Sequence, residues 1–127
     1  MSDGAAEIRK LAYDLSAVSA KMVGPMRSVF KQSADLLATE WANNARATSG
    51  VHGKHYPNSI DADLRFSLGN IEAEVGPNSG KPQGSMGRGF EFGSVNQRPH
   101  LDGLKAVDKL EPLVEKAIEA AVTDLLP

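Results

Sequence analysis

The hydrophobic residues near both ends of the chain recur at the spacing of a helix. In residues 4–22 apolar side chains return every three or four positions, which predicts a first helix. Gly24 and Pro25 are typical of a helix end followed by a new first turn, so we expect a break there. The same spacing predicts a second helix over residues 25–47, and a wide apolar stripe predicts a last helix over residues 101–125.

Between these helices the hydrophobic period changes to two. Residues 59–68 alternate strictly between polar and apolar side chains, and residues 71–75 continue the alternation. The intervening Gly69-Asn70 suits a two-residue type II′ turn, which would pair Leu68 with Ile71. This pairing places the apolar side chains of both strands on one face. The pattern therefore predicts a β-hairpin with one apolar and one polar face.

The remaining segments divide into loops and one further strand. Residues 48–58 are rich in Gly, Pro, Ser and Asn, which predicts a loop. Residues 78–89 contain four Gly and only one sizeable apolar side chain, Met86, so they bury little surface against their ordering entropy. We expect a flexible loop there. Phe90 and Phe92 then alternate with a polar residue, which predicts a short third strand with both rings turned inward.

Together these elements predict a single α+β domain over residues 1–127. We expect a small antiparallel sheet of three to four strands, with the N-terminal and C-terminal helices packed on its apolar face. The opposite face of this sheet is expected to be polar and acidic. Its carboxylates are Asp61, Asp63, Glu72 and Glu74.

Composition removes several classes of function. The chain has no cysteine, which excludes thiol catalysis, disulfides and thiolate zinc sites. Its net charge is -2 without a concentrated basic face, which argues against stable duplex binding by the monomer. The opening Met1–Gly4 lacks the basic and apolar segments of a secretory signal, and no apolar run approaches the ~20 residues needed to cross a bilayer.

Candidate catalytic and metal-binding groups do not converge in the sequence. His52 and His55 lie in a loop without a third ligand at a suitable spacing, and two histidines alone seldom fix zinc. The glycines in residues 84–89 precede a predicted strand, whereas phosphate-binding loops open a helix. The paired carboxylates would need a cleft to act as acid and base. We therefore expect no catalytic residues, no cofactor and no metal, although a hydrolase or nuclease using the two histidines remains an alternative.

Four short motifs occur in an order that resembles a known family. They are Asn58-Ser59-Ile60, Glu74-Val75-Gly76-Pro77, Phe90-Glu91-Phe92-Gly93-Ser94 and Gln97-Arg98-Pro99. Over residues 25–122 the chain resembles the small neck and tail-completion proteins of long-tailed, siphovirus-type bacteriophages. Two features depart from the family pattern. His100 stands where the family usually has Phe, and the loop before the first hairpin strand is longer.

The resemblance implies a structural role without turnover. Such proteins form a ring, here expected to be a hexamer or dodecamer, that joins the capsid portal complex to the tail tube. The implied partners are further copies of the chain, other connector and tail proteins, and genomic DNA that passes without sequence-specific binding, with no membrane involved. The implied location is the neck or tail of the virion, assembled in the host cytoplasm.

Two sets of residues are predicted to serve this role. Residues in and after the Gly-rich segment are predicted to contact neighbouring subunits, because a flexible segment can become ordered on a partner; they are Lys81, Met86, Arg88, Phe90, Glu91, Arg98 and Pro99. The acidic sheet face is predicted to line the lumen and to repel the DNA backbone; its residues are Asp61, Asp63, Glu72 and Glu74. An alternative function is a small nucleic-acid-binding module that uses the basic residues Lys81, Arg88 and Arg98.

Overall fold

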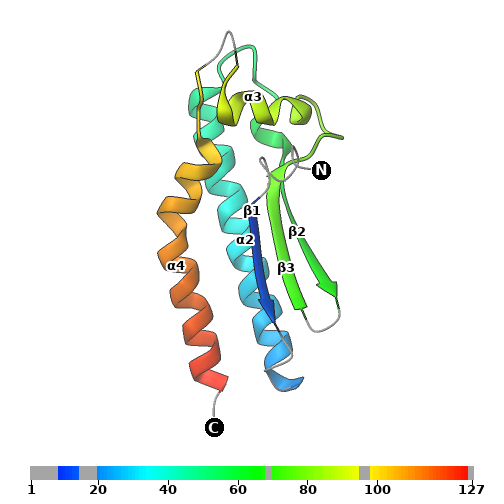
Figure 1. Ribbon diagram of the computed structural model, residues 1–127, viewed down its shortest axis with the longest axis vertical. Helices are drawn as coiled ribbons and strands as arrows, with labels where there is room; N and C mark the ends of the chain where they lie inside the picture. The colour runs from blue at the N-terminus through cyan, green and yellow to red at the C-terminus, as the bar shows by residue number, and fades with distance from the viewer. Residues whose placement is uncertain (1–8, 15–19, 68–69, 95–97, 126–127) are drawn as a thin grey trace.

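The computed structural model describes residues 9–14, 20–67, 70–94 and 98–125 of the chain. In order, the elements are β1 (Arg9–Asp14), α2 (Ala20–Thr48), the 3-10 turn η2 (Pro57–Ser59), β2 (Ile60–Ser67), β3 (Asn70–Pro77), the 3-10 turn η3 (Gly84–Met86), α3 (Gly87–Phe92) and α4 (Asp102–Leu125). Figure 1 shows α2 lying along the sheet, α4 beside α2, and α3 at one end of the molecule. The class is α+β, as predicted, but the composition of the sheet is not.

The β2–β3 hairpin is confirmed with a different register. Both strands are antiparallel, and Phe66 lies opposite Ile71, where the sequence predicted Leu68. Ser67 pairs with Asn70, so the connection is residues 68–69, which lie outside the described residues. A shift of two residues leaves every side chain on its original face, so the hydrophobic pattern cannot distinguish the two registers.

The prediction of an N-terminal helix was wrong over residues 9–14. This segment is strand β1, which pairs antiparallel with β3 and makes the sheet order β1-β3-β2 among the described strands. In the register Leu11 lies opposite Ala73 and Tyr13 opposite Ile71. Leu11 and Tyr13 are two residues apart, so the segment also fits a strand, and the free edge of β3 supplies the backbone partners that select it.

The predicted third strand was also wrong, because Phe90 and Phe92 belong to helix α3. Residues two apart on a helix point about 200° apart, so only one ring can face inward. Phe90 is buried and stacks on Tyr56 with ring centroids 4.5 Å apart, whereas Phe92 is 41% exposed. Of the predicted strands, only β2 and β3 are therefore strands.

Helix α2 runs unbroken through the expected break and forms one side of the core. Pro25 is the sixth residue of α2, so it removes only one intrahelical hydrogen bond, close to the start of the helix. Beyond it, Met26, Phe30 and Trp41 are fully buried against the sheet and α4. The predicted C-terminal helix is confirmed as α4, but it packs mainly on α2 rather than directly on the sheet.

The Gly-rich segment 78–89, predicted as a flexible loop, is folded against the domain. A Cβ atom at Gly84 would lie 1.8 Å from the backbone oxygen of Asn78. The backbones of Gly84 and Asn78 can therefore approach this closely only because glycine has no side chain. The Gln83 carboxamide donates to one backbone group and accepts from another in the loop before η2, both at 2.7 Å. Polar and backbone contacts therefore connect the segment to the loop before η2, and the count of apolar residues did not consider them.

Candidate interaction surfaces

A buried carboxylate joins α3 to the start of α4. Glu91 is 1% exposed, and its two oxygens accept hydrogen bonds from the backbone N–H of Gly103 at 2.9 Å and of Leu104 at 3.0 Å. These are among the N–H groups that a helix start leaves without intrahelical partners, and a negative charge is favourable there. Glu91 thus caps α4 from outside that helix. Glu91 was predicted to contact a neighbouring subunit, but its side chain is buried inside the domain.

A second buried carboxylate fixes the start of α4 against the end of α2. Asp102 is 1% exposed, and its Oδ2 accepts a 2.7 Å hydrogen bond from the Thr48 hydroxyl. The Asn44 side chain donates to the Asp102 backbone oxygen at 3.0 Å. At Gly103 an added side chain would lie 2.8 Å from the ring of Trp41, so the helix start and the indole are in close contact. Both acids therefore serve to place α4.

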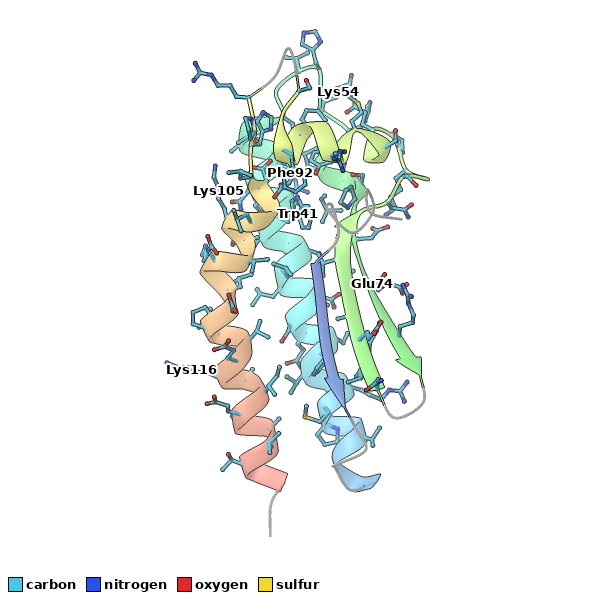
Figure 2. The ribbon with its side chains drawn as sticks, viewed as in Figure 1. Trp41, Lys54, Glu74, Phe92, Lys105 and Lys116 are labelled. Atoms are coloured by element: carbon cyan, nitrogen blue, oxygen red, sulfur yellow. The ribbon has the colours of Figure 1, made fainter. Side chains whose placement is uncertain are left out.

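The predicted acidic face is present on the sheet but is partly neutralised. Asp63 lies directly opposite Glu74, and both line a shallow pocket with Asp61. Arg65 forms an ion pair with Glu74, which Figure 2 labels on the sheet. Lys81 Nζ lies 2.6 Å from Asp61. Among the described side chains, two of the four carboxylates therefore have a basic partner, which weakens the repulsion expected toward DNA.

The ion pair at Asp61 changes its acidity. Partial burial raises the pKa of the Asp61 carboxyl, but the hydrogen bonds from Lys81 and Asn78 and the Lys81 charge together hold it below its ordinary value of 3.8. The carboxyl is therefore ionised at neutral pH. This contact ties the Gly-rich segment to β2.

The predicted interface residues divide into buried and exposed groups. Phe90 and Glu91 are buried and support the fold. The side chains of the other predicted residues are exposed; they are Lys81, Met86, Arg88, Arg98 and Pro99. His52 and His55 are also exposed, and no group of three or more His, Asp or Glu among the described residues could hold a metal ion.

One end of the molecule combines exposed apolar and basic side chains. We define the α3-end surface as Val51, Lys54, Met86, Phe92 and Arg98. These side chains are exposed, and the three apolar ones are 82%, 44% and 41% exposed in the order Val51, Met86 and Phe92. Figure 2 shows Lys54 and Phe92 at the same end of the domain. The sequence analysis missed Phe92 because it assigned that residue to a buried strand position.

An apolar groove lies between α2, β3 and α4. Its volume is about 230 Å³. We define the α4 groove by its apolar lining, which includes Ala34, Leu37, Val75, Val107, Val114 and Ile118. Glu111 and Glu115 line its α4 side, and both are exposed. The groove forms where α4, which packs on α2, meets the sheet beside the β1–β3 pair, a placement that the helix pattern does not determine.

Comparison with known proteins adds no assignment to these surfaces. No protein-family model, curated protein or solved structure matches this chain. Among the described residues, no helix has the length and apolar character required to span a membrane.

Proposed function

We propose that this chain is a non-enzymatic structural subunit of a phage head–tail connector. In this role it forms a ring in the neck, or completes the tail, and joins the capsid portal complex to the tail tube. The ring is made of copies of the chain and contacts other connector and tail proteins. Genomic DNA passes through it without sequence-specific binding.

The observation that supports this role best is the α4 groove. Val75 of β3 and Leu110 of α4 both line it, so the apolar hollow reaches the core between the helices and the sheet. Exposed apolar side chains also lie elsewhere on α4, where Leu104 is 40% and Leu113 is 56% exposed. Of these features, the apolar hollow is the one typical of a subunit that completes its packing in an assembly. The order of the four sequence motifs adds the specific expectation of a phage connector.

The nucleic-acid alternative loses part of its basic site in the folded chain. Lys81 pairs with Asp61, so its charge is partly neutralised by the domain itself. Arg88 and Arg98 are exposed near α3, but a phosphate-binding surface usually gathers more cations than this. Affinity that falls steeply with salt would be required for this alternative.

The proposal is tested by the state of the purified protein and by its loss from the virus. Native mass spectrometry and electron microscopy of the protein should show closed rings, alone or on isolated tails. Deleting the gene from the phage that carries it should yield filled capsids and separate tails. A protein that stays monomeric in both settings, or virions that assemble normally without it, would overturn the proposal.

A further inference from the structure

We propose that the α4 groove receives the α3-end surface of a second copy of this chain. The inference rests on the proposed function and specifies which surfaces of neighbouring subunits meet. Phe92 is the side chain expected to enter the groove. The two surfaces are complementary in shape, polarity and charge.

The α4 groove matches the α3-end surface in shape and polarity. The groove encloses about 230 Å³ and is lined mainly by aliphatic side chains. A cavity of about 150 Å³ with such a lining accommodates a benzene molecule, so a phenylalanine ring fits. Phe92 and Met86 are 41% and 44% exposed, and both lie in the short α3–η3 segment at the end of the molecule. An aromatic anchor that enters an apolar pocket is the usual centre of a strong protein contact.

The charges of the two surfaces are also opposite in sign, beginning with the acids of α4. Glu111, Glu115 and Glu119 form a row along α4 at four-residue spacing, and none of them has an ion-pair partner among the described residues. Among the lysines of α4, Lys109 forms an ion pair with Glu40 of α2 at 3.1 Å, and Figure 2 shows Lys105 and Lys116 directed away from α2. Like charges at this spacing repel each other, and an approaching cation would relieve the repulsion.

The α3-end surface supplies such cations. Lys54 and Arg98 are exposed there, and the described residues 49–56, 79–94 and 98–101 contain no exposed carboxylate. The only acid within these ranges, Glu91, is buried beneath α4. An apolar centre with a basic edge would therefore meet an apolar groove with an acidic edge, an arrangement that favours one orientation of the two copies.

The geometry also has a consequence for symmetry. The two surfaces are different patches of the same chain, so each copy would use its groove for one neighbour and its α3 end for another. Such a head-to-tail contact is heterologous and closes into a ring when the rotation per subunit divides the circle. This is the type of contact that the proposed connector ring requires.

Disulfide trapping tests the pairing directly, because the natural chain has no cysteine. Chains carrying Phe92→Cys and chains carrying Val114→Cys are purified separately, mixed and oxidised. A disulfide forms only when the two Cβ atoms come within about 4.5 Å. The matched control mixes Phe92→Cys with Lys116→Cys, which places the thiol on the outer side of α4. We expect at least fivefold more cross-linked dimer with Val114→Cys than with the control.

The same samples separate the inference from the proposed function. If the unmodified protein forms rings but the two mixtures cross-link equally or not at all, the surface pairing is wrong and the connector role stands. If the unmodified protein remains monomeric alone and on tails, the connector role itself fails. Preferential cross-linking through Val114→Cys, with rings in the unmodified sample, supports both.

Two substitutions extend the test to affinity and charge. Phe92→Ser should weaken association about tenfold or more, as for loss of a buried aromatic anchor. Leu36→Ser is the control, because Leu36 is 47% exposed on α2 and lies outside the groove lining; its association constant should change less than twofold. The doubly substituted chain Glu111→Lys/Glu115→Lys should lose association and regain it when mixed with Lys54→Glu/Arg98→Glu chains. Association of the first chain with itself at full strength would overturn the charge pairing.

Discussion

The cap that Glu91 places on α4 leads to a prediction about stability. Removing its side chain leaves the backbone N–H groups of Gly103 and Leu104 without their acceptors. A hydrogen bond to a charged group contributes about 1.5–3 kcal/mol. We therefore expect Glu91→Ala to lower the free energy of unfolding by about 3 kcal/mol, a large part of the roughly 5–15 kcal/mol typical of a small domain.

A conservative variant gives an intermediate value. Glu91→Gln keeps one oxygen that can accept a hydrogen bond, but its amide group is a donor and would face a second N–H. The expected loss is about 1.5 kcal/mol. The control is Glu115→Ala, which removes an exposed carboxylate from α4, the helix that Glu91 caps, and should change stability by less than about 0.5 kcal/mol.

Urea unfolding followed by tryptophan fluorescence measures these differences. Trp41 is the only tryptophan, is fully buried and contacts Gly103, so its emission reports the junction between α2 and α4. A loss of 3 kcal/mol lowers the urea midpoint by about 1–3 M. If Glu91→Ala unfolds at the same midpoint as the natural chain but assembles less well, the cap has no role in stability and Glu91 belongs to a subunit contact instead.

Three further predictions concern the fold. Gly103→Ala should lower the free energy of unfolding by about 1–3 kcal/mol, because the new methyl group would overlap the indole ring of Trp41. Gly24 has open space around it, so Gly24→Ala should raise the free energy of unfolding by about 0.5–1 kcal/mol. Urea midpoints measure both changes. Phe90→Asp should prevent cooperative melting, because it buries an unpaired charge, whereas Phe92→Asp should leave the melting curve unchanged when followed by circular dichroism. Loss of cooperative melting in both variants would instead support a strand with both rings buried. Because the pKa of Asp61 is lowered on folding, its ion pair stabilises the protein above the ordinary pKa of 3.8 and this contribution disappears as the pH falls below it. In acid titrations Asp61→Asn should therefore lose part of the pH dependence of stability, and an unchanged titration curve would contradict the ion pair.

Regular patterns of hydrophobic residues were sufficient to predict the hairpin strands and α4. The alternation in residues 59–75 predicted the hairpin, and the stripe after residue 101 predicted α4, because each pattern extends over several turns or strand pairs. The hairpin register escaped prediction since two registers that differ by two residues bury the same side chains. The polarity of the sheet faces was likewise predictable, but the basic partners of Asp61 and Glu74 were not considered.

Short segments were decided by their surroundings. The six residues of β1 fit both a helical and an alternating pattern, and pairing with β3 selected the strand. Helix α3 is also only six residues long, and the packing of Phe90 on Tyr56 together with the cap from Glu91 favours the helix. In both segments the local preference is weaker than the contacts made with distant parts of the chain.

The sequence by itself determined the composition of the two proposed surfaces: an apolar stripe with acids on α4, and a Gly-rich segment that carries Met86 and ends near Phe92. Only the tertiary structure decided that α4 rests on α2 and leaves a groove toward β3, and that Phe92 points outward. The physical reason is that periodicity records which side of an element is apolar. It does not record the distance to the element opposite, and that distance determines whether an apolar side becomes core or remains open to a partner.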